Sequence, residues 1–239
     1  MTKANPATSG SAAPGAPAAP GPAGADGTGG TGGTGVRDSS PRARFRGQIR
    51  DEAKALALRQ LAEGGAQALS LNAIAKSLGM SGPALYRYFA NREALLTDLI
   101  VDAYHDLAAA MGAALAAAEP AHQPHDRLAG LVTAYRAWAV AEPHRYRLLF
   151  RAPLFGYDPQ APALVEASQP AMTVAVEAVT PLLPRSAPPT AAAALATSLW
   201  AGLHGLVSLE IEGNFSSMGL DPVPLYDTQV RAILHAAQA

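Results

Sequence analysis

Residues 70–92 read SLNAIAKSLGMSGPALYRYFANR and contain two short helical patterns joined by a turn. The first pattern begins at Ser70, whose hydroxyl can accept a hydrogen bond from a free amide of the first turn. Gly79 can end this helix, because a residue without Cβ adopts the left-handed conformation at little cost. Ser81 can then cap a second helix. The stretch predicts a helix-turn-helix.

The second of these helices carries side chains that suit the major groove of DNA better than a plain protein surface. Leu85 and Phe89 lie four residues apart and can face the core together. Tyr86, Arg87 and Tyr88 offer two hydroxyls for phosphates and a guanidinium for base edges. The pattern therefore indicates a recognition helix; the alternative is a helical hairpin that only packs against its neighbours.

Residues 85–93, LYRYFANRE, resemble the hallmark of TetR-type transcriptional regulators, a Leu-Tyr-x-[His/Tyr]-Phe run followed by a polar residue, a basic residue and Glu. The resemblance extends without a gap over residues 44–105. It implies an all-α fold, in which a three-helix DNA-binding domain is joined by a long helix to a helical dimerisation and ligand-binding domain. It also implies that the long helix carries an allosteric motion.

The same resemblance implies a set of DNA-binding residues. Phosphate contacts are expected from Ser70, Tyr86 and Arg92. Base edges or the adjacent backbone are expected to face Asn72, Gly82, Ala84, Arg87 and Tyr88. The set also includes Ser81, Arg44 and Arg46. Because Asn72 and Ala84 are small, we expect Arg87 and the arginines that precede the first helix to carry more of the sequence preference.

Charge is distributed unevenly along the chain. The whole chain has a formal net charge of −1, which alone does not indicate a nucleic-acid partner. Residues 37–92 contain ten Lys and Arg against four acids, a net charge of +6, whereas residues 93–239 contain seven against fourteen, a net charge of −7. A basic head on an acidic body concentrates phosphate binding at one end of the molecule.

Residues 41–50, PRARFRGQIR, bring several arginines directly onto the first helix. They are compatible with an arm that follows phosphates or enters the minor groove, or with a solvated start of that helix. The density of arginine favours the DNA role, because each neutralised phosphate releases counterions.

Composition divides the chain into three predicted parts. Residues 1–40 are almost entirely Ala, Gly, Pro, Ser and Thr and predict a disordered tail, because they bury too little apolar area to offset their conformational entropy. Residues 41–92 are assigned to the helix-turn-helix DNA-binding domain and residues 93–239 to the helical ligand-binding and dimerisation domain. The sequence has no cysteine, which excludes disulfides and zinc-thiolate sites.

The predicted body consists of helices alone. Asn91 can cap a helix that continues to about Ala118 and is about 40 Å long. Further helical patterns cover residues 126–142, 164–183 with an interruption near Pro170, 190–212 and 225–237, with a short segment at 144–150. Residues 186–209 carry no formal charge, but their many Ala, Thr, Ser and Gly residues indicate a buried helix rather than a membrane span.

Aromatic residues of the body could line a cavity between helices. The candidate ligand-binding residues are Tyr135, Trp138, Phe150, Phe155, Met172, Trp200 and His204. For each of them alone a core position is favoured, and only the group as a whole supports a ligand cavity. The run from Trp200 to Gly205, WAGLHG, resembles a ligand-domain subfamily of TetR-like regulators marked by a Trp-x-x-His-Gly run.

These features predict a cytoplasmic, homodimeric, ligand-responsive repressor that binds a palindromic double-stranded operator, because two recognition helices about 34 Å apart can read two half-sites. The alternatives are a nucleoid-type or activating DNA binder without a small-molecule effector, and a small helical enzyme. No nucleophile elbow, HExxH motif or paired carboxylates support catalysis. We expect no cofactor, no metal site and no membrane partner; His122 and His125 fit a solvated loop.

Overall fold

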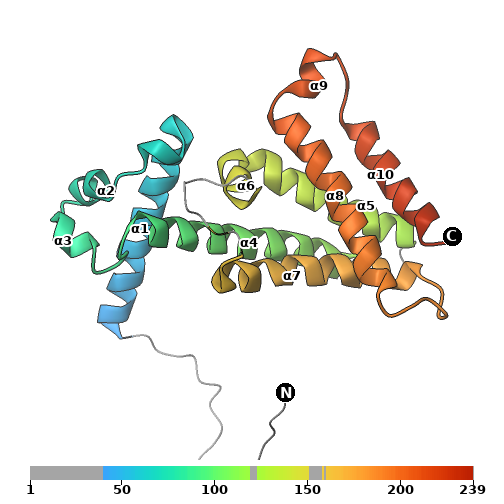
Figure 1. Ribbon diagram of the computed structural model, residues 1–239, viewed down its shortest axis with the longest axis horizontal. Helices are drawn as coiled ribbons and strands as arrows, with labels where there is room; N and C mark the ends of the chain where they lie inside the picture. The colour runs from blue at the N-terminus through green and yellow to red at the C-terminus, as the bar shows by residue number, and fades with distance from the viewer. Residues whose placement is uncertain (1–39, 119–122, 151–157, 159, 239) are drawn as a thin grey trace, which may run out of the picture. The chain divides into compact units, whose positions relative to one another are not determined.

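The computed structural model describes residues 40–118, 123–150, 158 and 160–238. Every regular element within these residues is helical (Figure 1). This confirms the all-α prediction for the described part of the chain. The predicted tail up to residue 39 and the candidate ligand residue Phe155 lie outside the described residues.

The N-terminal helices form the predicted helix-turn-helix arrangement. They are α1 (Pro41–Gly64), the short 3-10 helix η1 (Ala66–Ala68), α2 (Leu71–Ser77) and α3 (Gly82–Leu85). The Ser70 hydroxyl accepts a hydrogen bond from the Ala73 amide at 3.3 Å, which caps α2 as predicted. Gly79 has a φ of 66° and ends this part of the chain in the left-handed conformation that glycine favours. Leu85 and Phe89 are almost completely buried.

The predicted arginine arm is the first part of α1 rather than an extended arm. Ser40 caps this helix, since its hydroxyl accepts from the Ala43 amide at 3.3 Å, and Pro41 occupies the first turn, where a missing amide hydrogen costs nothing. Phe45 is 62% exposed, so the helix begins in solvent and reaches the core only from Ala53 onward.

The long helix α4 (Arg92–Ala117) connects the helix-turn-helix region with the body. The Asn91 side chain caps it as predicted, because Asn91 Oδ1 accepts a hydrogen bond from the Ala94 amide at 2.7 Å. The other body elements are α5 (Pro124–Ala141), α6 (Pro143–Phe150), α7 (Pro162–Val179), η2 (Thr180–Leu182), α8 (Ala191–Ile211), α9 (Asn214–Ser217) and α10 (Val223–Ala236). Helix α4 packs against α5, α6 and α7 (Figure 1).

Helix α7 corrects one prediction, because it runs through Pro170 without a break. A proline inside a helix removes one backbone hydrogen bond and costs roughly 3 kcal/mol. The buried residues Leu164, Ala167 and Ala175 lie on both sides of Pro170 and anchor the helix in the body, where it packs against α4 and α8. Tertiary packing therefore outweighs the local signal of the proline.

Helix α8 buries only one of its faces, whereas the sequence predicted a buried helix. Leu195, Leu199 and Leu203 are buried, but Trp200 is 38% exposed and Leu209 is 43% exposed. By length and composition α8 and α4 could each cross a membrane, but each of them contributes a row of buried side chains to the core. The exposed face of α8 is thus available for another contact.

Candidate functional site

The turn between α2 and α3 depends on two glycines. Gly79 takes the left-handed conformation, and the Met80 amide donates to the Ala75 carbonyl at 2.9 Å, which closes the end of α2. A Cβ added at Gly82 would lie 2.9 Å from Asn72 Oδ1, so glycine allows α3 to approach α2 closely. The Asn72 side chain, a predicted base reader, is exposed and lies beside Gly82.

The recognition helix is shorter than the sequence indicated. Helix α3 ends at Leu85, and Tyr86, Arg87 and Tyr88 follow in a hydrogen-bonded turn, in which the Tyr88 amide donates to the Leu85 carbonyl at 2.9 Å. Tyr86 is 46% exposed and Arg87 is exposed. Tyr88 is half-buried against the core, and its carbonyl accepts from Arg50 Nη1 at 3.2 Å.

The predicted DNA-binding residues differ in how far they reach into solvent. Exposed members are Arg44, Arg46, Asn72, Ser81, Tyr86 and Arg87, and half-buried members are Ser70, Gly82, Ala84, Tyr88 and Arg92. Ser81 precedes α3, but its side chain makes no capping hydrogen bond, contrary to the prediction. The Ser70 hydroxyl uses a lone pair for the cap and keeps its O–H free to donate to a phosphate.

Arg92 opens helix α4 directly after the turn. Its Nε and Nη2 atoms are buried without a hydrogen-bond partner among the described residues. The first turn of a helix also presents free amide groups and a positive partial charge, which favour an anion. The start of α4 can thus attract an anion, whereas the buried Nε and Nη2 atoms would meet a phosphate only after the Arg92 side chain moves.

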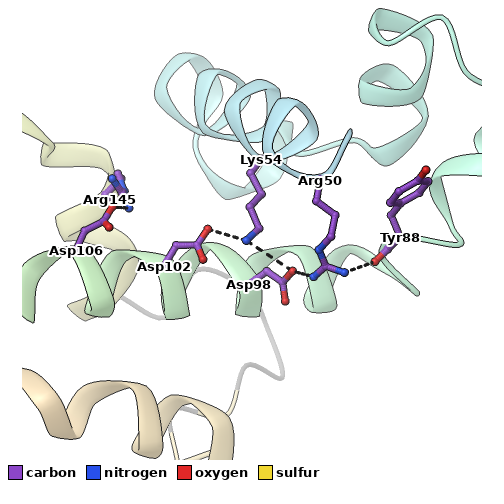
Figure 2. A network of polar contacts seen from close by, with 7 residues as sticks. All are labelled: Arg50, Lys54, Tyr88, Asp98, Asp102, Asp106 and Arg145. Carbon is purple, nitrogen blue, oxygen red and sulfur yellow. Dashed lines mark hydrogen bonds and ion pairs between the residues drawn. The ribbon is translucent and has the colours of Figure 1, made fainter. Parts of the chain in front are cut away.

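Two cations of the basic head pair with α4 and so contribute less to a DNA surface than their count suggests. Arg50 pairs with Asp98, and Lys54 Nζ lies 2.7 Å from Asp102 Oδ2 and 3.9 Å from Asp98 Oδ2 (Figure 2). These ion pairs were not predicted, although the sequence carries a signal for them: Asp98, Asp102 and Asp106 recur every four residues and share one face of the helix.

The third acid of this row, Asp106, pairs with Arg145 of α6 (Figure 2). One face of α4 thus holds α1 through Asp98 and Asp102, and holds α6 through Asp106. Helices α1 and α6 also pack against each other. Ion pairs on one face of α4 therefore link α1, α4 and α6.

A cavity of about 190 Å³ lies among α4, α5, α6, α7 and α8. Of the predicted ligand residues, Tyr135, Phe150, Met172 and Trp200 line this cavity. The cavity is also lined by residues that were not predicted: Tyr104, Leu107 and Met111 of α4, Leu131 of α5, Ser168, Ala171 and Ala175 of α7, and Leu199 and Leu203 of α8. Aliphatic residues of a cavity have the same helical spacing as core residues, so the sequence does not distinguish them.

Two predicted ligand residues lie elsewhere. Trp138 is half-buried, packs against the core and borders neither this cavity nor the next. His204 lines a second cavity of about 120 Å³, where its Nδ1 atom lies 2.7 Å from the Tyr146 hydroxyl. Burial lowers the pKa of His204, and burial is also the largest cause that raises the pKa of Tyr146. Both side chains are therefore neutral at pH 7.

A half-buried ion pair connects α5, α8 and α10. Arg136 Nε donates to Glu210 Oε2 at 2.9 Å, and the Tyr226 hydroxyl donates to the same oxygen at 2.7 Å. The hydrogen bond from Arg136 is the main cause that holds the pKa of Glu210 below its usual range. On α8, a Cβ at Gly202 would overlap Gln229 of α10, so the small residue accommodates α10.

Comparison with known proteins agrees with both halves of this architecture. Residues 55–99 match a family model described as bacterial regulatory proteins, tetR family, and residues 128–233 match one described as tetracyclin repressor-like, C-terminal domain. The HTH-type transcriptional regulators Rv1816 of Mycobacterium tuberculosis and Mb1846 of Mycobacterium bovis are each 33% identical to the chain over 216 residues, with 79% of this chain and 92% of each relative covered.

Solved structures have the same fold. The crystal structure of SCO4313 is 42% identical, has a TM-score of 0.71, and is matched over 82% of this chain and 100% of its own. A tetR-family transcriptional regulator from Streptomyces coelicolor is 19% identical, with a TM-score of 0.60 and 80% of each chain covered, and it supports the fold alone.

The Trp-x-x-His-Gly subfamily is not confirmed, because Trp200 and His204 are separated by three residues and neither family description names that subfamily. The family itself is shown by the sequence identity, the matched models and the common fold. The chain belongs to the TetR family of DNA-binding transcriptional regulators.

Proposed function

We propose that this regulator is a ligand-responsive repressor that acts as a homodimer on a palindromic operator in the cytoplasm. The observation that carries the proposal is the combination, in one chain, of an exposed helix-turn-helix surface with a cavity in the body. Helix α4 contributes residues to both regions, because Arg92 opens it beside the turn and Met111 lines the cavity.

DNA contact is assigned to the surface formed by α2, the turn and the segment after α3. Arg87 and Tyr86 are exposed there, and Arg92 opens helix α4 directly after the turn. We assign base contact to Arg87, and phosphate contact to Ser70, Tyr86 and Arg92. Arg44 and Arg46 are exposed near the start of α1 and add phosphate contacts from a helical position rather than from an arm.

Dimerisation is assigned to α7 and the exposed face of α8. Residues 191–209 contain no Asp, Glu, Lys or Arg, and Ala194, Ala201 and Gly205 of this stretch are exposed. An uncharged helical face with small residues permits close approach of a symmetry-related copy. The two-fold axis would place two helix-turn-helix surfaces on successive turns of one face of DNA.

The effector is assigned to the 190 Å³ cavity. A ligand that expands this cavity would displace α4 or its neighbours, and the ion pairs of Asp98, Asp102 and Asp106 would transmit the displacement to α1. The effector changes DNA affinity only if it binds the two conformations with different affinity, and such coupling is typically about 1–3 kcal/mol.

The test of the DNA-binding surface is Arg87→Ala. A duplex is first selected by the wild-type protein from a random library, and affinity is then measured for this duplex and for a scrambled one. We expect the substitution to cost about 1–3 kcal/mol on the selected duplex and to narrow the difference between the two duplexes. Arg185→Ala is the matched control, because Arg185 is an exposed arginine of the body. Equal losses on both duplexes would show that Arg87 does not read bases.

A further inference from the structure

The described wall of the 190 Å³ cavity is mainly apolar. None of the described residues that line it is Asp, Glu, Lys, Arg or His. Its wall consists mainly of aromatic and aliphatic side chains, among them Tyr104, Phe150 and Trp200. Transfer of an unpaired ion from water into such an environment costs far more than one hydrogen bond returns. The cavity therefore selects against an anionic or cationic ligand.

One polar group beside this cavity lacks a partner. Tyr135 lines the cavity, is 2% exposed, and has a buried hydroxyl without a hydrogen-bond partner among the described residues. Tyr146 and Trp200 lie close enough to influence its pKa, but among the described residues the Tyr135 hydroxyl has no hydrogen-bond partner of good geometry. Burial is the main cause that raises this pKa well above the usual value, so the hydroxyl keeps its proton and is a donor.

The wall has two further hydroxyls, on the half-buried Tyr104 and on Ser168, and that of Ser168 is already engaged. Ser168 Oγ donates to the Val165 carbonyl at 2.8 Å, within helix α7. An oxygen acceptor on a ligand would therefore find its donor at Tyr135 rather than at Ser168. Since an unsatisfied buried donor is unfavourable, a ligand oxygen that reaches it would gain binding energy.

The volume of the cavity limits the ligand in size. An apolar cavity of about 150 Å³ holds one benzene molecule, and this cavity measures about 190 Å³. It therefore accommodates a ligand body of one or two fused rings. The aromatic rings of its wall offer edge and face contacts that suit a planar apolar group.

We infer that the effector is an uncharged, mainly apolar molecule of one or two rings, with a hydroxyl or carbonyl oxygen that accepts a hydrogen bond from Tyr135. The inference rests on the proposed function, since it specifies the ligand of the same cavity. The inference goes beyond the proposed function because it excludes charged effectors and names Tyr135 as the residue that recognises the ligand's oxygen.

The test uses four probes that share one ring system. Naphthalene has no polar group, 2-naphthalenemethanol has a neutral hydroxyl, 2-naphthoate is an anion, and 2-naphthylmethylammonium is a cation. Binding of each to the full-length protein is measured by calorimetry. We expect both neutral probes to bind and both ions to bind at least tenfold more weakly. An ion that binds as tightly as the alcohol would overturn the inference, and so would the failure of all four probes to bind.

Tyr135→Phe tests the hydrogen bond. It should weaken 2-naphthalenemethanol about fivefold, the equivalent of one neutral hydrogen bond, and leave naphthalene unchanged. The substitution removes a hydroxyl that has no hydrogen-bond partner of good geometry among the described residues, so the melting temperature of the free protein should stay the same or rise. An equal effect on both probes, or a clear drop in melting temperature, would contradict the assigned role of the hydroxyl.

A second variant locates the probes. Ala171 is half-buried and lines the cavity, so Ala171→Leu should fill part of it and weaken both neutral probes at least tenfold. Unchanged affinity would place the probes elsewhere and overturn the inference.

Each preparation is also titrated with the DNA duplex selected from the random library. Protein that binds this duplex but no probe refutes the ligand class alone, whereas protein that binds no duplex counts against the proposed function.

Discussion

The helix-turn-helix surface and the body cavity differ in charge and in exposure. At the surface, Tyr86 and Arg87 are exposed, and Arg92 opens α4 directly after the turn. The cavity has no charged residue among its described lining, and Tyr135 beside it is almost fully buried. Substitution at the surface should therefore change DNA affinity with little effect on stability, whereas substitution of buried residues should change stability first.

The largest effect on stability is expected for a buried residue of the helix-turn-helix region. Phe89 is 1% exposed and Arg50 lies over its ring at 4.9 Å. Phe89→Ala should lower the free energy of unfolding by about 3–5 kcal/mol, because it leaves a cavity. Phe45→Ala, at a position that is 62% exposed, should change it by less than about 0.5 kcal/mol. Urea denaturation measures both; similar losses would show that Phe45 is not a surface residue in solution.

The next largest effect on stability is expected at the ion pair between Arg136 and Glu210, which lies in the body outside the cavity. Glu210→Gln should lower the free energy of unfolding by about 1–3 kcal/mol at pH 7, because it weakens the hydrogen bonds from Arg136 and Tyr226. The folded-state pKa of Glu210 lies below its usual value. Its contribution is therefore fully present above the unfolded pKa of about 4.3 and is lost as the pH falls through the folded-state value.

Urea titrations between pH 3 and pH 8 test this pH dependence. The difference between wild type and Glu210→Gln should shrink below about pH 4.3. Glu63→Gln is the control, because Glu63 is exposed near the end of α1, outside the proposed dimer interface, and should change stability little at any pH. A difference that grows toward low pH would contradict the assignment of Glu210 as a stabilising carboxylate.

The smallest effect separates two serines of the helix-turn-helix surface. Ser70 accepts a capping hydrogen bond, so Ser70→Ala should cost about 1 kcal/mol of stability. Ser81 makes no such bond, and Ser81→Ala should be nearly neutral. Thermal melting of the two variants is a direct comparison. Equal losses would mean that Ser81 caps α3 in solution after all.

Local signals in the sequence were enough to predict the helix boundaries that depend on one or two residues. Ser70, Gly79 and Asn91 act at the positions where their capping or turn chemistry predicts. Features set by distant contacts were not predicted. Helix α7 continues through Pro170 because packing holds it, and Arg50 and Lys54 appear as free cations until α4 is placed beside α1.

The candidate sites show the same limit. The DNA-binding set follows from the motif, but the early end of α3 places Arg87 and Tyr88 in a turn, a difference that depends on how this segment packs. For the cavity, Tyr135, Phe150, Met172 and Trp200 were identified by residue type, whereas Trp138 lies elsewhere. Aromatic residues in cores and in cavities have the same sequence pattern, so only the packed helices distinguish them.

The central claim is that two copies of this chain read two half-sites at once. The most direct test measures affinity and stoichiometry on the selected palindromic duplex, and on the same duplex with five base pairs inserted at its centre. The insertion rotates one half-site by about half a helical turn. The account predicts two or more chains, in multiples of two, on the original duplex and a loss of at least tenfold in affinity on the expanded one. One chain per duplex with unchanged affinity would contradict it.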